Sequence, residues 1–319
     1  MSIHSEIELL EAKKILESGN IVAIPTETVY GLAANVFNEV AISKIFKTKN
    51  RPQDNPLIVH IKGKSSVEEV AKDIPDVAYK LMDKFWPGPL TLVLQKNEAV
   101  PETVTAGKNT VAVRMPNHPL ILQLLESLPF PLVAPSANRS NHISPTSPKH
   151  VKKSLKENTP FILNGGKCAQ GIESTIIGFK EDHLVLYRKG NITIDELEIS
   201  TGMEVKSAVN SRNIVAPGMK SKHYSPSTPF ITTTTLEKTI RDNSNKKIGL
   251  ILQGPKKHPE VEVVKYLSCN GNLKEAASNL YAYMHELDEL NLDLIIAEFM
   301  PNEGIGSSIN DRLQRANNQ

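Results

Sequence analysis

Side chains that could bind an anion gather close to the N-terminus of the sequence. Lys49 and Arg51 are cations, and Thr28, Asn55 and His60 supply hydrogen-bonding groups in the same stretch. Arg51 and Asn55 each precede a proline, which restricts the backbone to extended or turn geometry. A long basic side chain held in one direction is favoured when an anion binds to it. The alternative is that Lys49 and Arg51 only stabilise the C-terminal end of a helix through its dipole.

A second group of polar residues follows apolar, strand-like runs. Arg114 ends the run TVAVR and shares one strand face with Thr110 and Ala112, because side chains alternate along a strand. A buried arginine needs a carboxylate partner, which a side chain or a ligand could supply. His60 follows LIV, where a histidine serves either as a structural hydrogen-bonding group or as a ligand contact.

Hydroxyl, amide and guanidinium groups recur at the ends of later apolar runs, at Ser136, Asn138, Ser144, Ser174 and Arg188. Such groups either cap turns or donate hydrogen bonds to phosphate and ribose. Ligands bind where strands end and loops begin. The repetition therefore predicts one pocket lined with anion-binding groups.

The carboxylates expected near this pocket are Glu27 and Glu173, and either could serve the chemistry or pair with an arginine or lysine. No acidic cluster predicts a metal site formed by the protein alone. The sequence also lacks a recognisable Ser–His–Asp or Cys–His motif. Ile58 stands where a P-loop would need its first glycine, and Ile309 where a dinucleotide-binding motif would need its third.

The composition limits the classes of function. The chain of 319 residues is 39% apolar with a net charge of +2, which is typical of a globular protein without a general preference for polyanions. Aromatic residues make up 5%, few for a platform that stacks single-stranded nucleic acid. Cys168 and Cys269 lie far apart, which argues against a disulfide framework or zinc site. With no signal peptide or membrane span in the pattern, we expect a cytoplasmic protein without membrane contact.

The elements that must position these residues alternate between strands and helices. A strand at 21–24, a helix, and a strand at 57–61 together have the size of a βαβ unit. Further strands are predicted at 90–95, 110–115, 132–134 and 161–164, with a hairpin at 174–188 and helices at 5–18, 66–72, 77–85 and 119–127.

We predict an α/β domain around a mixed, twisted sheet at residues 1–203. Residues 204–228 lose the hydrophobic period and are rich in Pro, Gly, Ser and Lys, as is typical of a linker. Residues 229–319 predict a smaller α/β domain, with strands at 246–252 and 292–299 and a helix at 273–287.

Taken in order, these motifs resemble the Sua5/YrdC family in its two-domain Sua5 form. The matching strings of the first domain are PTETVYGL, KxRPxxNPLIVH, WPGPLT, TVAVRMPxHP, APSAN, SPT and GIESTI. The linker contributes APGMKSKHYSP and the second domain GIGSSINDRLQRA. The resemblance implies a YrdC-like open sheet of parallel and antiparallel strands, followed by a smaller Rossmann-like C-terminal Sua5 domain.

The resemblance also implies L-threonylcarbamoyladenylate synthase activity, a nucleotidyl transfer. L-Threonine, bicarbonate and ATP would give threonylcarbamoyl-AMP and pyrophosphate, with Mg²⁺ arriving on ATP. The product would pass to a tRNA threonylcarbamoyl transferase complex for the t6A37 modification, and weak RNA contact is compatible with this role. Because a carbamate is unstable in water, the enzyme would exclude solvent, position the reactants and neutralise charge.

By resemblance, the expected L-threonine ligands are Thr28, His60, Arg114, Ala134 and Ser174. The expected ATP ligands are Lys49, Arg51, Asn55, Thr110, Ser136, Asn138, Ser144, Arg188 and, from the linker, Tyr224. Lys49 and Arg51 are the expected catalytic cations, and no metal ligand is expected from the protein alone. No general base stands out: His60 is a candidate, but the substrate or a phosphate of ATP could take the proton instead.

The place of Tyr224 predicts that the linker closes over the nucleotide as a lid, so that loss of residues 205–319 weakens ATP binding. Three other functions remain open. A non-catalytic RNA-binding module would bind RNA with a steep salt dependence. A carbamoyl-transferring enzyme of the hydrogenase-maturation type would need zinc-finger cysteines, and an inactive relative would lack motif residues that are present here.

Overall fold

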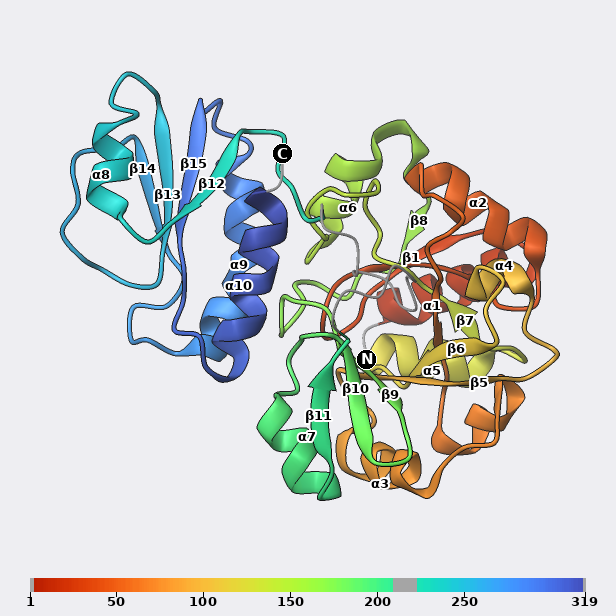
Figure 1. Cartoon of the computed structure of the whole chain (residues 1–319). Coiled ribbons are helices and arrows are strands. Elements are labelled where there is room, and N and C mark those ends of the chain that lie inside the picture. Colours follow the sequence, from red (N-terminus) through yellow and green to blue (C-terminus); the bar gives the residue numbers. More distant parts are fainter. Residues whose placement is uncertain (1–2, 209–222, 318–319) are drawn as a thin grey trace.

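The computed structural model describes residues 3–208 and 223–317. Figure 1 shows that these two parts of the chain each contain a sheet of their own. We call them the N-terminal region (residues 3–208) and the C-terminal region (residues 223–317). The predicted α/β fold with a mixed sheet is confirmed.

The N-terminal region is built on an 11-stranded sheet with the main order β11-β10-β9-β5-β6-β3-β7-β2-β1-β8, and β4 pairs with β5. Strand β3 is parallel to β6 and antiparallel to β7, so the sheet is mixed at its centre. The strands are β1 (Val22–Ile24), β2 (Gly31–Asn35), β3 (Ile58–His60), β4 (Ala71–Lys72), β5 (Leu90–Lys96), β6 (Thr110–Arg114), β7 (Leu132–Val133), β8 (Phe161–Ile162), β9 (Thr175–Phe179), β10 (His183–Arg188) and β11 (Glu204–Ser207).

Strand β2 corrects the predicted βαβ unit. It follows β1 and pairs with it antiparallel, so the strands at 21–24 and 57–61 are not the two parallel partners. The parallel strands are instead β2 and β3, and β7 lies between them, antiparallel to both. The sequence of β2, GLAAN, contains no β-branched or aromatic residue, so propensity gave no sign of a strand.

Strand β11 corrects the predicted start of the linker. It pairs parallel with β10 at the edge of the large sheet, although residues from 204 onward were expected to connect the domains. Only Val205 of its residues is buried, so the strand shows no apolar alternation. Residues 209–222, most of the predicted lid, lie outside the described part of the chain.

The helices of the N-terminal region pack on both faces of the sheet. Ala23 of β1 enters a core with residues of α2 and α3, whereas its neighbours Val22 and Ile24 enter a core with α1 and α5. The predicted helix at 66–72 is a 3₁₀ turn, Lys64–Glu69, followed by β4. The helices are α1 (Ile3–Glu17), α2 (Glu39–Lys49), α3 (Asp76–Phe85), α4 (Glu102–Thr105), α5 (Pro119–Ser127), α6 (Pro148–Leu155) and α7 (Ile194–Thr201), with a second 3₁₀ turn at Lys156–Asn158.

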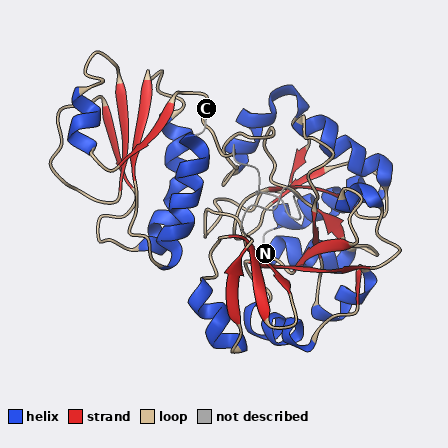
Figure 2. Cartoon of the chain, viewed as in Figure 1, coloured by secondary structure: helices blue, strands red, loops and turns tan. Residues whose placement is uncertain are grey.

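The C-terminal region is a four-stranded parallel sheet with the order β12-β15-β13-β14. Figure 2 shows its two long helices, α9 and α10, between this sheet and the N-terminal region. The elements are β12 (Phe230–Thr233), α8 (Leu236–Arg241), β13 (Ile248–Leu252), β14 (Val263–Tyr266), α9 (Leu273–Leu287), β15 (Leu294–Glu298) and α10 (Gly304–Asn317). Among the described residues, no helix is both long enough and apolar enough to cross a bilayer.

Candidate active site

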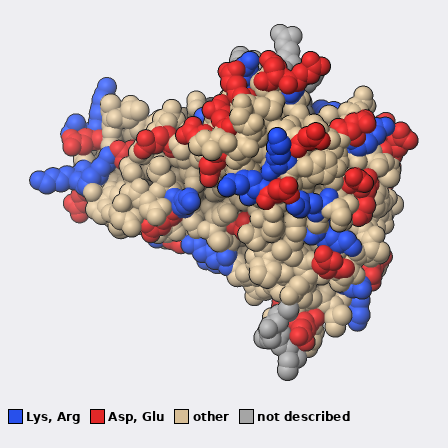
Figure 3. All heavy atoms as spheres, turned by 90° about the horizontal axis from the view of Figure 1, so that it is seen from below, with Lys and Arg blue, Asp and Glu red and all other residues tan. Residues whose placement is uncertain are grey.

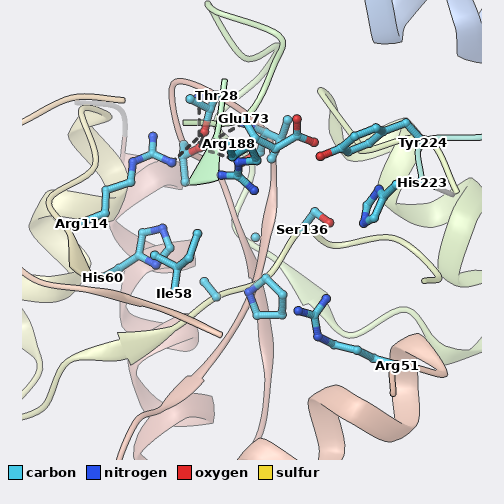
Figure 4. A pocket seen from close by; sticks show the side chains of 15 residues that line it. Thr28, Arg51, Ile58, His60, Arg114, Ser136, Glu173, Arg188, His223 and Tyr224 are labelled. Atoms are coloured by element: carbon cyan, nitrogen blue, oxygen red, sulfur yellow. Dashed lines mark hydrogen bonds between the residues drawn. The ribbon is translucent and has the colours of Figure 1, made fainter. Parts of the chain in front are cut away.

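Eight of the predicted site residues meet in one pocket where strands of the large sheet end (Figure 4). They are Thr28, Arg51, His60, Arg114, Ala134, Ser136, Arg188 and Tyr224. The lining is completed by Thr26, Val29, Gly31, Ile58, Pro135, Glu173 and His223. The fold therefore brings polar residues from the ends of separate strands into one pocket, as the sequence predicted for these eight residues.

The register of two strands explains why His60 and Arg114 lie together. Strands β3 and β6 are parallel, and His60 is paired with Arg114. Their neighbours Val59 and Val113 enter the larger core, so His60 and Arg114 project from the opposite face, into the pocket.

Arg114 is held by two hydrogen bonds and one ion pair. Its Nε donates to the carbonyl of Gly88 at 3.2 Å, and its Nη1 donates to Thr28 Oγ1 at 3.0 Å. Its Nη2 lies 2.6 Å from Glu27 Oε1. The expected carboxylate partner of Arg114 is thus a side chain of the same region.

His60 is a neutral, buried imidazole. Burial, assisted by the nearby Arg114 charge, lowers the pKa of His60 to about 3. Its Nδ1 has no hydrogen-bond partner among the residues that the structure describes. A neutral ring with one open nitrogen suits a hydrogen bond to a ligand, whereas a general base works best with a pKa near the operating pH.

Two further guanidinium groups enter the pocket from separate elements. Arg51 follows α2 and donates to the carbonyls of Asn55 at 3.2 Å and Pro56 at 2.8 Å. Arg188 ends β10 and donates to the carbonyl and the hydroxyl of Ser174. Burial lowers the pKa of Arg51 to about 10 and also lowers the pKa of Arg188, but both stay protonated at neutral pH. With Arg114, the pocket has three cations and favours anionic ligands.

Lys49 and Asn138 lie behind the pocket wall. The ammonium group of Lys49 is nearly inaccessible and donates to the carbonyls of Ser136 and Asn138. The Asn138 amide donates to two backbone carbonyls of its own loop. Burial, assisted by Arg51, lowers the pKa of Lys49 well below its usual value. Both residues fix the loop that presents Ser136.

Four other predicted ligands also lie outside the lining: Asn55, Thr110, Ser144 and Ser174. Asn55 and Ser174 bond the two arginines described above. Ser144 donates to Glu173 Oε1 at 2.6 Å. Thr110 begins β6, at the opposite end of the strand from Arg114.

Two polar lining residues, Thr26 and His223, were given no ligand role from the sequence. Thr26 Oγ1 lies 2.9 Å from Thr28 Oγ1, so the spacing of the two hydroxyls in PTET was a usable signal. His223 precedes Tyr224 in HYSP, and burial lowers its pKa to about 3. The centroids of the two rings lie 4.0 Å apart, and both residues line the pocket. These two residues of the predicted lid therefore form part of the pocket wall together.

The fold and the pocket together define an α/β protein with a buried, arginine-lined site for small anionic substrates. Two family models match the chain. The Sua5/YciO/YrdC model, described as "Telomere recombination", matches residues 14–190, and the Sua5_C model, "Threonylcarbamoyl-AMP synthase, C-terminal domain", matches residues 192–318.

Known proteins match over almost the full length. The threonylcarbamoyl-AMP synthase of Pyrococcus abyssi is 40% identical, with 96% of this chain and 92% of that protein covered. The enzyme of the same name from Bacillus subtilis is 38% identical, with 97% and 92% covered. The crystal structure of P. abyssi Sua5 complexed with L-threonine has a TM-score of 0.90 at 38% identity and covers 99% of this chain and 96% of that one. The chain belongs to the two-domain Sua5 family.

Proposed function

We propose that this chain condenses L-threonine, bicarbonate and ATP to threonylcarbamoyl-AMP and pyrophosphate, which is a nucleotidyl transfer. The observation that supports it best is the meeting of Arg51, Arg114 and Arg188 in one buried pocket. The reaction must hold a carboxylate, a carbamate and a triphosphate close together, and guanidinium groups suit all three. Full-length relatives carry the name of this activity.

We place L-threonine against the β3–β6 side of the pocket. Arg114 would bind its carboxylate, and Thr28 and His60 would bind its polar groups through Oγ1 and the open Nδ1. Ala134 would contribute backbone atoms, and Ser174 would act from behind the lining through Arg188. His60 is assigned hydrogen bonding and not proton transfer, because its pKa is held near 3.

ATP would lie toward Arg51, Arg188, Ser136 and Tyr224. The threonine amine would attack the carbon of bicarbonate with loss of water, and a carbamate oxygen would then attack the α-phosphorus as pyrophosphate leaves. The guanidinium groups would offset the charge that develops on the phosphate oxygens. Lys49 and Asn138 would act through the Ser136 loop, and Asn55, Thr110 and Ser144 remain proposed ATP ligands.

Mg²⁺ would arrive with the triphosphate. In the described parts of the chain no group of three or more His, Cys, Asp or Glu side chains could hold a metal ion. The carboxylate in the lining, Glu173, is already bonded to Ser144, Tyr281 and Arg312. Phosphate oxygens and water, the ligands that Mg²⁺ prefers, would therefore supply its coordination.

The product would pass to a tRNA threonylcarbamoyl transferase complex in the cytoplasm for the t6A37 modification. Direct RNA binding would be weak, since the net charge of the chain is only +2. On the one face that Figure 3 shows, basic and acidic side chains are interspersed.

The test is pyrophosphate release from ATP with threonine and bicarbonate each omitted in turn. We expect release only with both, together with incorporation of labelled bicarbonate into a threonylcarbamoyl adenylate. Release that does not depend on threonine, or a product without the bicarbonate carbon, contradicts the proposed function.

A further inference from the structure

One carboxylate in the pocket wall is bonded by both regions of the molecule. Glu173 precedes β9 and is 6% exposed. Ser144 of the N-terminal region donates to its Oε1 at 2.6 Å. From the C-terminal region, Tyr281 of α9 and Arg312 of α10 each donate to its Oε2 at 3.0 Å. Both oxygens are thus occupied, and two of the three donors belong to the C-terminal region.

Arg312 contacts other parts of this pocket wall besides the carboxylate of Glu173. It is 0% exposed, and its Nη2 donates to the carbonyl of Lys189 at 2.8 Å, one residue after Arg188. Its guanidinium carbon lies 5.3 Å from the centre of the Tyr224 ring, within the range of a cation–π interaction. One side chain of α10 therefore contacts the segments that place Glu173, Arg188 and Tyr224 in the pocket.

The backbones of the two regions are also in close contact next to this wall. A Cβ atom on Gly171 would lie 2.5 Å from the Cα of Ser278 in α9, so only glycine fits there. Ser308 of α10 donates to the carbonyl of Gly190 at 2.8 Å. The chain is thus fixed to the C-terminal helices on both sides of the β9–β10 hairpin.

We propose that Arg312 and Tyr281 are positioning residues for the nucleotide part of the site, acting through Glu173. They hold Glu173, the chain after Arg188 and, through the ring contact, Tyr224 in the arrangement that receives ATP. The inference deepens the proposed function, on which it rests. It assigns helices α9 and α10 an indirect part in nucleotide binding, because Tyr281 and Arg312 act through Glu173 and the chain around it and do not contact the substrates themselves.

The main test removes one hydroxyl from the network. Tyr281→Phe keeps the packing of the ring but takes one donor from Glu173. We expect the Kd for ATP, measured by calorimetry, to rise about tenfold, and the KM for threonine to stay within about twofold. Tyr283→Phe, on the same helix with its ring near Lys265 rather than the pocket, is the matched control and should match the unchanged protein. An ATP affinity unchanged in Tyr281→Phe overturns the proposal.

A second measurement shows whether the hydroxyl acts through the carboxylate. In a Glu173→Gln background, Tyr281→Phe should change the Kd for ATP by less than about twofold, because its route to the pocket is already weakened. A full tenfold effect in that background overturns the proposed route. Arg312→Lys, which keeps a cation but loses the fork of donors, should raise the Kd for ATP without lowering the threonine affinity.

These outcomes stay distinct from failure of the proposed function. Calorimetry reports ATP binding whether or not the protein turns over. A wild-type protein that binds ATP but releases no threonine-dependent pyrophosphate would refute the reaction, and the Tyr281 comparison would still decide the positioning role.

Discussion

Two buried carboxylate–guanidinium pairs flank the pocket. Glu27 and Arg114 both belong to the N-terminal region, lie 2.6 Å apart and are 6% and 5% exposed. Glu173 and Arg312 form an ion pair of 3.0 Å between the two regions, and their side chains are 8% and 0% exposed. In burial and distance the pairs are alike.

They differ in the hydrogen bonds around them. Glu27 Oε1 and Arg114 Nη2 are in contact as an ion pair, but among the described residues neither of these atoms makes a hydrogen bond, and Glu27 Oε2 makes none either. Both oxygens of Glu173 accept hydrogen bonds. A buried ion pair stabilises a protein only when its remaining polar atoms are bonded. The first pair therefore suits a site that a polar ligand completes, and the second suits a permanent joint.

The largest expected effect comes from removing the cation of the first pair. Arg114→Ala should raise the KM for threonine about 100-fold, because the carboxylate of the substrate loses its charged partner. The KM for ATP should change less than about threefold. Steady-state pyrophosphate release measures both, and Arg114→Lys, which keeps the charge, should recover part of the loss. Equal increases in the two KM values would show that Arg114 does not bind threonine.

The substitution Glu27→Gln tests whether the carboxylate of threonine pairs with Arg114 in addition to Glu27. The change leaves the Arg114 guanidinium buried without a full negative partner, so the free energy of unfolding should fall by about 2 kcal/mol. Threonine supplies a carboxylate, so it should raise the melting temperature more in the variant than in the unchanged protein. Calorimetry with and without threonine measures this. A smaller threonine shift in the variant would contradict the comparison.

The interface around the second pair should weaken in acid before the pair itself is protonated. His150 and His285 stack at 4.0 Å between the regions, and burial lowers the pKa of His150 to about 4 and that of His285 well below its usual value. At His150, Glu289 opposes this shift of the pKa, whereas Lys149 and Lys153 add to it. At His285, His150 and then the two lysines lower the pKa further, and the hydrogen bond to the Ser144 carbonyl opposes them. In the unfolded chain these rings gain protons below pH about 6.5.

Stability should therefore fall from pH about 6.5 toward 4, by about 1.4 kcal/mol per pH unit for each ring. The pKa of Glu173 is lowered to about 2, chiefly by Arg312 against the effect of burial, so its contribution is lost only below pH about 4.5. Thermal unfolding across this range measures the slope. His285→Gln, which keeps a donor for the Ser144 carbonyl, should flatten it. An unchanged slope would place the acid sensitivity elsewhere.

The smallest effect is expected from an exposed ion pair between the same two regions. Lys149 and Glu289 lie 2.9 Å apart but are 73% and 33% exposed. Lys149→Met should change the free energy of unfolding by no more than about 0.5 kcal/mol, because water and salt screen such pairs. Neither KM should change. A loss as large as that of Glu27→Gln would mean that burial is not what makes the two central pairs stronger than this exposed one.

The parts of the fold that follow a regular period could be predicted from the sequence. Helix α9 was predicted at its observed bounds, and the β9–β10 hairpin and helix α5 were also found. Strands β2 and β11 were missed because their stability comes from neighbouring strands and not from their own apolar pattern.

In the site, too, features with a local sequence pattern could be predicted, and features that depend on distant partners could not. Polar residues at the ends of strands, such as Arg114 and Arg188, stand out in the local sequence and were predicted. The bond between Glu173 and Arg312 joins residues 139 positions apart, and no local pattern indicates such a partner. The sequence also could not predict that the Lys49 side chain points into the protein, because the carbonyls that accept its hydrogen bonds belong to a loop almost ninety residues later.

The burial of Lys49 has a practical consequence for chemical labelling. The residue is 1% exposed, and its amine donates to the carbonyls of Ser136 and Asn138. Reagents that acetylate amines will modify exposed lysines quickly but will reach Lys49 only when the loop at residues 134–138 detaches. The acetylation rate of this single lysine, followed by peptide mass spectrometry, would thus time the opening of one pocket wall in the native protein.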